Sequence, residues 1–249
     1  MRTRGGLMIG IALIFSTGAP RLLIGPALPQ DEPMNPSAPP PPSPKSGASL
    51  IEAPVFPLPN AILFPGVLLP LHIFEERYKL MVESALSGDR RLAVSLLRKS
   101  AEGEWAPSMV CGLGEIMKVE DLDNGERNIL VKGITRVVLR EVRQEAPYMK
   151  GLLQPLDDLH PQEAVARPEK HEITRLAQQL IFLLDMKDAA RWMNMIGFME
   201  DPSLLADFVS FYLIEDISLK QDLLETLDVL VRMQRLKTAL EEVIKGLEA

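Results

Sequence analysis

The chain has 249 residues, of which 47% are hydrophobic, enough to bury a core of ordinary size in one or two domains. Its 27 basic and 34 acidic residues give a formal net charge of -7, which argues against the broad basic surface that nonspecific nucleic-acid binding requires. The single cysteine, Cys111, excludes an intramolecular disulfide. The composition therefore favours a globular protein that does not require an oxidising compartment.

The first 50 residues predict an extension without a core of its own. Two arginines followed by the apolar run 7–15 resemble an export signal, but this run is shorter than the ~20 residues that span a bilayer, so we expect no membrane span. Two interpretations remain: an over-extended start with translation beginning near Met34, or a genuine signal within residues 1–30. Residues 33–49 are rich in Pro and Ser, which is typical of a linker.

Residues 51–160 predict a β-rich unit, because short apolar runs alternate with Pro and Gly. Asp123-Asn124-Gly125 is a hairpin signal and predicts a two-residue turn between strands near 112–121 and 127–133. The expected strands cover residues 55–58, 61–64, 67–71, 92–97, 112–119, 128–131 and 136–142. One helix that plugs or covers the sheet is indicated by Phe74, Tyr78, Met81, Val82 and Ala85 at helical spacing, with Gly88 as its terminator.

Residues 161–249 predict a helical bundle that follows an acidic, Pro-containing connection over 157–168. A first helix carries the apolar face of residues 173–184. Asp201 as N-cap and Pro202 at the first helical position open a second. Ser218 with Gln221 fits a capping box for a short third helix.

The final helix, from about Asp228, has apolar residues at alternating steps of four and three, which is a heptad stripe. Two interpretations are open for this stripe: packing within its own bundle, or a homo-oligomer formed through a coiled coil. The stripe consists of Val229, Met233, Leu236, Leu240, Val243 and Leu247.

No motif predicts a catalytic, cofactor or metal site. Gly112-Leu113-Gly114 lies in an apolar strand, where glycine marks a bulge or a close backbone approach rather than a phosphate loop. The three histidines have no zinc-ligand spacing. Cys111 has apolar neighbours, so we expect it to be structural. These observations predict a protein that is not an enzyme.

The most specific stretch is residues 55–78, VFPLPNAILFPGVLLPLHIFEERY, which resembles the opening of the N-terminal substrate-binding domain of Lon proteases. Residues 124–136 resemble that family's turn and following strand, and residues 204–240 its helical part. The matching positions, which we interpret as mainly structural, are Pro57, Leu58, Phe64, Pro65, Gly66, Pro70, Leu71, Ile73, Phe74, Glu75, Arg77, Tyr78, Gly125, Gly133 and Arg136.

The resemblance implies an α+β fold, in which a PUA-like β-barrel with one packed helix is followed by a C-terminal helical bundle. It also implies a stand-alone, bacterial-type, ATP-independent module without the Lon ATPase and peptidase. Such a module would bind polypeptide substrates in the cytoplasm and deliver them to a protease or chaperone as an adaptor. Peptides could add to an open sheet edge or lie in a groove between barrel and bundle.

Other function classes remain open at this point. PUA-like barrels in other families bind RNA, although the acidic composition and the few aromatic residues make this the less favoured function. An enzyme with an unrecognised pocket would show titratable residues that converge in a cleft. A regulatory oligomer would leave the heptad stripe of the last helix exposed in the monomer.

Overall fold

The computed structural model describes residues 49–99, 104–123 and 125–248. The predicted extension therefore lies almost wholly outside the described residues, as does Asn124 of the hairpin signal. All the strands of the described residues lie before residue 160, together with one helix, and the other helices follow it. In order they are β1 (Ile51–Leu58), β2 (Leu68–Ile73), α1 (Glu76–Ser87), β3 (Arg91–Lys99), β4 (Trp105–Pro107), β5 (Val110–Asp121), β6 (Arg127–Gln144), β7 (Lys150–Leu156), α2 (Glu163–Leu183), α3 (Ala189–Gly197), α4 (Pro202–Leu213), α5 (Ile217–Glu225) and α6 (Val229–Glu248).

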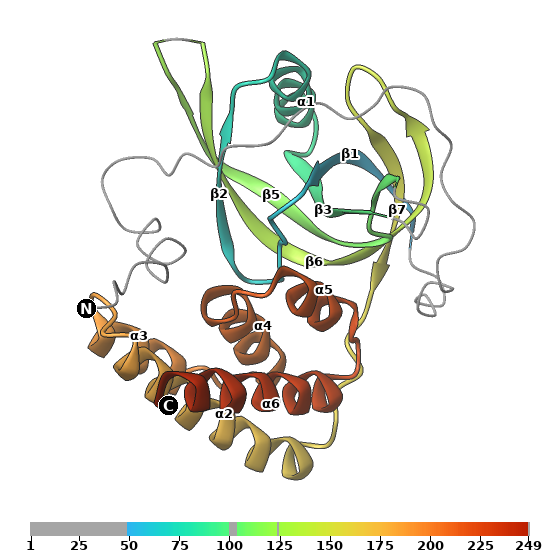
Figure 1. The fold of residues 1–249 in the computed structure, drawn as a ribbon. Helices are drawn as coiled ribbons and strands as arrows, with labels where there is room; N and C mark the ends of the chain where they lie inside the picture. The colour runs from blue at the N-terminus through green and yellow to red at the C-terminus, as the bar shows by residue number, and fades with distance from the viewer. Residues whose placement is uncertain (1–48, 100–103, 124, 249) are drawn as a thin grey trace.

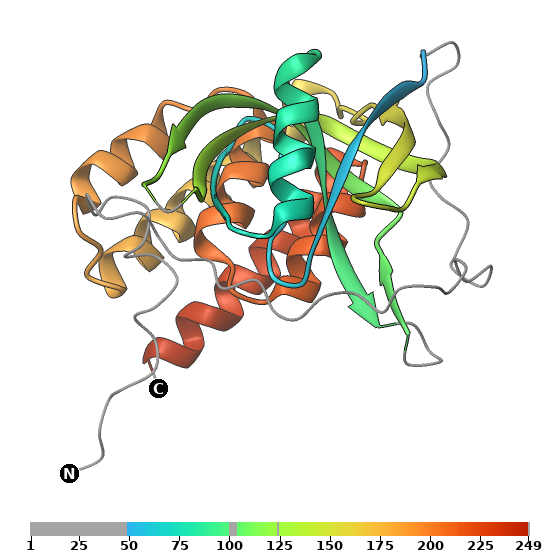
Figure 2. The same ribbon diagram turned by 90° about the horizontal axis from the view of Figure 1, so that it is seen from above.

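Five strands close into a barrel. They pair in the order β1-β7-β6-β5-β3, and a parallel pairing of β1 with β3 completes the ring. β2 adds to β6 and the short β4 adds to β3. The helices α2 to α6 gather below the barrel, and α1 lies on its opposite side (Figures 1 and 2). The predicted α+β fold, with one helix on a barrel and a following helical bundle, is confirmed.

The predicted strand at 61–64 is wrong, because this segment is a buried loop that lies against β5 and β6. Gly112 and Gly133 permit the contact. A Cβ atom on Gly112 would lie 1.8 Å from the carbonyl oxygen of Leu63, and one on Gly133 would lie 1.9 Å from that of Phe64. Both glycines are therefore points of close backbone approach, which is one of the two roles that the Gly112-Leu113-Gly114 pattern predicted for Gly112. The register of β5 also shifts at Gly114.

β6 runs through both strands that were predicted for its region, because Gly133 continues the strand instead of ending it. The hairpin between β5 and β6 is present, but its loop is longer than predicted. Leu122 donates from its backbone N–H to the carbonyl of Glu126 over 2.9 Å, so three residues form the loop instead of two. Gly125 has a φ of 76°, a left-handed conformation that favours glycine.

Helix boundaries show what local signals can predict. Asp201 caps α4 as expected, because its side chain accepts hydrogen bonds from the backbone N–H groups of Ser203 and Leu204. The capping box at Ser218 is wrong. Asp216 caps α5 instead, and the side chain of Gln221 is buried against β5, where it donates to the carbonyl of Val110.

Two further helical features differ from the sequence prediction. α2 begins at Glu163, so Pro168 lies within the helix and not in the connection before it. Proline lacks the N–H group that an interior helical position uses, so the sequence favoured a helix that begins after Pro168. The helix α3 was not predicted at all, since its nine residues are too few to show a helical period clearly.

The heptad stripe of α6 packs mainly within its own bundle. Its first four members are buried, whereas Val243 and Leu247 are exposed. α6 runs parallel to α2: Lys237 pairs with Glu169 at 3.2 Å, and further along Gln179 donates to Glu248 at 3.0 Å. The stripe thus lacks the general exposure that a coiled-coil interface would require. None of the helices in the described ranges is long and apolar enough to cross a membrane.

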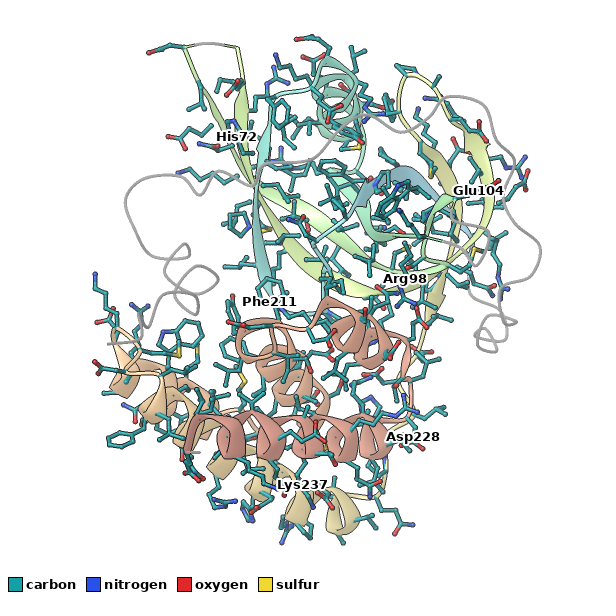
Figure 3. The ribbon with its side chains drawn as sticks, in the orientation of Figure 1. His72, Arg98, Glu104, Phe211, Asp228 and Lys237 are labelled. Atoms are coloured by element: carbon teal, nitrogen blue, oxygen red, sulfur yellow. The ribbon has the colours of Figure 1, made fainter. Side chains whose placement is uncertain are left out.

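Lys220 on α5 is a partly buried cation that predicts a pH dependence of stability. Its Nζ donates to the carbonyl of Phe211 at 2.8 Å. Phe211 is labelled on α4 in Figure 3. Burial lowers the pKa of Lys220 from 10.5 to about 8. Between these two pH values the unfolded chain keeps a proton that the folded chain has released, so the free energy of unfolding rises with pH across this window.

We therefore expect the wild type to gain about 2 kcal/mol of stability relative to Lys220→Met between pH 8 and pH 10.5. Urea unfolding of both proteins across this pH range measures the difference between their free energies of unfolding. The contributions of all other titrating groups cancel in this difference. A constant difference between the two proteins would show that Lys220 is solvated as in the unfolded chain.

Candidate functional site

A pocket of about 140 Å³ lies where the barrel meets the helical bundle. One wall is the loop between β1 and β2, and the other is the segment that joins α3 to α4 together with the first turns of α4. Carbon atoms dominate the lining, and two carboxylates are the only ionisable groups in it. The lining residues are Pro65, Gly66, Val67, Met199, Glu200, Asp201, Leu204 and Phe208.

Large apolar side chains are exposed beside the pocket. Leu204, which lines it, is 45% exposed, and Phe198, next to Met199, is 83% exposed. Leu68 follows Val67 on the barrel side and is 42% exposed. Exposed apolar side chains that adjoin an apolar pocket are characteristic of an interaction site.

The barrel wall of the pocket is held by β6. The backbone N–H of Gly66 donates to the carbonyl of Gly133 at 3.0 Å, and the N–H of Gly133 donates to the carbonyl of Val67 at 2.9 Å. Gly66 has a φ of 78°, and a Cβ atom there would lie 3.1 Å from a methyl group of Leu204. Glycine at this position therefore allows both the turn and the close approach of α4.

The bundle wall is backed by aromatic rings. The ring of Phe208 lies 5.7 Å from that of Trp192 on α3 and 4.5 Å from that of Tyr212, measured between centroids. The Tyr212 hydroxyl forms a hydrogen bond with the backbone of Leu68, and its burial raises its pKa. These contacts connect α3, α4 and β2 around the pocket.

A buried charge network fixes α4 against the barrel. Arg136 on β6 donates from Nη1 and Nη2 to the two carboxylate oxygens of Asp207 on α4, at 2.9 and 2.5 Å. Its Nε donates to the carbonyl of Leu224 on α5 at 2.9 Å. Arg136 and Asp207 are both almost fully buried, so the pair has little access to water.

A second arginine extends this network to α6. Arg232 donates from Nη1 and Nη2 to the two oxygens of Asp158, at 3.0 and 2.7 Å, and its Nε lies 3.3 Å from Asp207. Nη2 also donates to the hydroxyl of Ser203 at 2.6 Å, one residue before Leu204 of the pocket. Two arginines and two aspartates thus balance in charge and join the barrel, α4 and α6.

The ionisation of Asp158 reflects this environment. Burial alone would raise its pKa, but the hydrogen bond from Arg232 and the charges of Arg136 and Arg232 outweigh burial and lower it. Asp158 is therefore ionised at neutral pH, as the charge balance of the network requires.

Comparison with known proteins shows to which family the chain belongs. The family model of the ATP-dependent protease La (LON) substrate-binding domain matches residues 52–242. The chain belongs to this Lon domain family. Its fold is similar to the N-terminal domain of a Lon protease of the Mycobacterium avium complex, with a TM-score of 0.62 and 18% identity over 77% of this chain and 99% of that one. A Lon N-terminal domain protein from Xanthomonas campestris gives a TM-score of 0.54 at 19% identity, covering 76% of this chain and 98% of that one.

Full-length Lon proteases are also similar in sequence. "Lon protease 2" of Herpetosiphon aurantiacus is 28% identical over 82% of this chain and 25% of its own length. "Lon protease 2" of Myxococcus xanthus is 29% identical over 73% of this chain and 22% of its own length. The chain thus spans about a quarter of the Lon proteases that it matches.

The Lon motif residues predicted from sequence divide into two groups in the structure. Pro65 and Gly66 line the pocket, Gly133 holds their loop, and Arg136 anchors α4. The others do not line the pocket. They are Pro57, Leu58, Phe64, Pro70, Leu71, Ile73, Phe74, Glu75, Arg77, Tyr78 and Gly125.

Several motif residues outside the pocket hold α1. Glu75 and Arg77 pair with each other at 2.9 Å, and the guanidinium of Arg77 lies 4.5 Å from the centroid of the Tyr78 ring. Tyr78 in turn packs on Phe56 of β1, with ring centroids 4.4 Å apart. These contacts fix the start of α1 on the barrel.

Sequence reasoning missed the residues of the bundle wall and most of the charge network. Met199 was missed because α3 was not predicted, and Leu204 and Phe208 were missed because apolar spacing in a helix does not show which residues line a pocket. Asp207 did leave a signal, since it is the one charged residue within 203–214, whereas Arg232 lies in a helix that carries other charged residues. Buried charges of this kind require partners, which a single sequence does not identify.

Two observations on the described part of the chain concern metal and cysteine chemistry. No cluster of three or more His, Cys, Asp or Glu side chains there is placed to hold a metal ion. Burial raises the pKa of the Cys111 thiol to about 12, so at neutral pH this cysteine is not the thiolate that nucleophilic attack requires.

Proposed function

We propose that this chain is a non-catalytic module that binds apolar segments of polypeptides at the pocket between barrel and bundle. The observation that carries the proposal is the apolar pocket with Phe198, Leu204 and Leu68 exposed beside it. Membership of a family described as a substrate-binding domain supports it. An exposed apolar segment is the feature by which an unfolded polypeptide differs from a folded one.

The size of the pocket defines what it can take. A cavity of about 150 Å³ lined by apolar side chains accommodates a benzene molecule, and the present pocket of about 140 Å³ is close to that size. We infer that it receives one large apolar side chain of the bound segment. Neighbouring residues of that segment would then lie over Phe198 and Leu204.

Binding in the pocket is favoured over addition to the edge strand β2. Within the described residues β2 pairs only with β6, so its other edge is the one open to a peptide. Pro70 in this strand has no N–H group to donate, and the Tyr212 hydroxyl already bonds the backbone of Leu68. Both features weaken an added strand.

We further propose that the module acts as a cytoplasmic adaptor in protein quality control and presents its clients to a protease or chaperone. The division at about residue 160 into a barrel and a bundle subdomain would then place the client at their junction. Export remains the alternative if residues 1–30 act as a signal. RNA binding is the less favoured function, because Glu200 and Asp201 would repel phosphates at the pocket.

Leu204→Asp tests the proposed site. The probe is a fluorescein-labelled peptide of twelve residues with one Phe in a Gly/Ser background, and its fluorescence anisotropy is measured with the full chain. We expect at least about tenfold weaker binding, because a carboxylate replaces an apolar contact surface. A control peptide with Ser in place of Phe lacks the apolar side chain, so its affinity should be the same for the wild type and the variant.

The matched control is Leu80→Asp on α1, where the leucine is 46% exposed and remote from the pocket. This variant should bind the peptide as the wild type does, and circular dichroism should show both variants folded. Equal weakening by the two substitutions would contradict a site at the pocket. Binding of single-stranded RNA in competition with the peptide would instead favour the nucleic-acid function.

A further inference from the structure

Methionines are concentrated in α3 and in the segment after it, which reaches the bundle wall of the pocket. Three of the twelve methionines of the chain, Met193, Met195 and Met199, fall within seven residues of α3 and its end. Met199 lines the pocket, and Met195 is 38% exposed. Methionine side chains adapt to ligands of different shapes, which suits a surface that accepts many sequences. The same thioether is also the group that oxidants attack.

We propose that Met199 is an oxidation site through which peroxide weakens client binding at this pocket. The inference rests on the proposed function and adds its regulation. In the reaction the thioether sulfur attacks one oxygen of hydrogen peroxide, the O–O bond breaks, and an S–O bond forms. The sulfur is oxidised by two electrons to the sulfoxide, and the peroxide is reduced to water.

The lining of the pocket explains why a sulfoxide would interfere. Its oxygen is a strong hydrogen-bond acceptor, and no side chain in the lining donates a hydrogen bond at neutral pH. The polar groups that the side chains of Glu200 and Asp201 contribute are carboxylates, which repel a further acceptor. The backbone N–H of Gly66 is already bonded to the carbonyl of Gly133. A client side chain that entered the pocket would thus desolvate the new oxygen without replacing its bonds to water.

Other methionines provide internal controls. Met81 and Met233 are fully buried, so they should resist the oxidant in the folded chain. Met117 on β5 is 51% exposed and does not line the pocket, so it should be oxidised without consequence for binding. The effect on affinity should follow Met199 alone.

The experiment treats the full chain with hydrogen peroxide, maps sulfoxides by peptide mass spectrometry, and measures affinity for the single-Phe peptide. Oxidised wild type should bind about tenfold more weakly, and methionine sulfoxide reductases A and B together should restore the affinity. Met199→Leu should lose the sensitivity to peroxide, so that its affinity after the treatment equals its own affinity before it. Met199→Gln, a polar mimic, should bind weakly without oxidation, whereas Met117→Gln should bind as the wild type does.

The outcomes separate this inference from the proposed function. If untreated wild type does not bind the peptide, the proposed function fails. If untreated wild type binds and the affinity is unchanged when Met199 is oxidised, only the oxidation inference is overturned. It is also overturned if oxidised Met199→Leu loses affinity as the wild type does, since Met195 or another methionine would then be responsible.

Discussion

Replacing Asp207 by alanine is expected to lower the free energy of unfolding by about 3–5 kcal/mol, because Arg136 and Arg232 would remain buried without one of the two carboxylates that pair with both. Urea unfolding at pH 7 measures this loss. The matched control is Asp222→Ala, which removes an exposed carboxylate 3.8 Å from Arg98. The control should cost at most about 1 kcal/mol.

A second variant tests whether the network acts as a balanced unit. Replacing Arg136 and Arg232 by Met together with Asp207 by Leu and Asp158 by Asn removes all four charges of the network. This quadruple variant should be clearly more stable than Asp207→Ala alone, since uncharged side chains of similar size need no charged partners. A loss for Asp207→Ala no larger than that of Asp222→Ala would show that the two arginines reach water in the folded chain.

Gly133→Ala is expected to lower stability by about 3 kcal/mol or more, because its Cβ atom would lie 1.9 Å from the carbonyl oxygen of Phe64. Backbone must move to relieve this contact, and the loop that moves carries Pro65 and Gly66 of the pocket. We therefore expect weaker peptide binding as well as a lower unfolding midpoint in urea.

Gly246→Ala is the control for this substitution. Gly246 lies in α6 with no atom within 4 Å of its Cβ position, so alanine there should stabilise the helix by up to about 1 kcal/mol. If Gly133→Ala were as stable as the wild type, the loop between β1 and β2 could not be packed on β6 as described.

Local signals predicted those parts of the fold that depend on residues close in sequence. Asp201 and Pro202 marked the start of α4, and Gly88 marked the end of α1, because caps and terminators act within one helical turn. The β5–β6 hairpin was predicted from its turn residues. The fold itself followed from the motif-rich segment 55–78, whose resemblance to Lon domains the family match confirms.

What the sequence could not show depends on partners distant along the chain. Residues 61–64 were read as a strand because a buried apolar run looks the same in a loop that packs on Gly112 and Gly133. Gln221 looked like half of a capping box until its amide was found to bond β5. The pocket joins residues 65–67 to residues 199–208, a pairing that no local pattern encodes.

The roles of the predicted motif residues were only partly accessible. Arg136 was identified from a short strand motif, but its partner Asp207 lies 71 positions away. Pro65 and Gly66 were interpreted as structural, and the structure adds that they line a wall of the pocket. Whether the remaining motif residues contribute to binding stays a prediction.

Photocrosslinking tests the location of the binding site most directly. A twelve-residue Gly/Ser peptide with p-benzoyl-phenylalanine in place of its single Phe is irradiated with the full chain, and the crosslinked residues are identified by mass spectrometry. We predict crosslinks to residues 65–68 and 198–208, which competing unlabelled single-Phe peptide suppresses. Crosslinks concentrated on β2 at residues 70–73, on β4 or on α1 would contradict the proposal that the pocket between barrel and bundle receives the client.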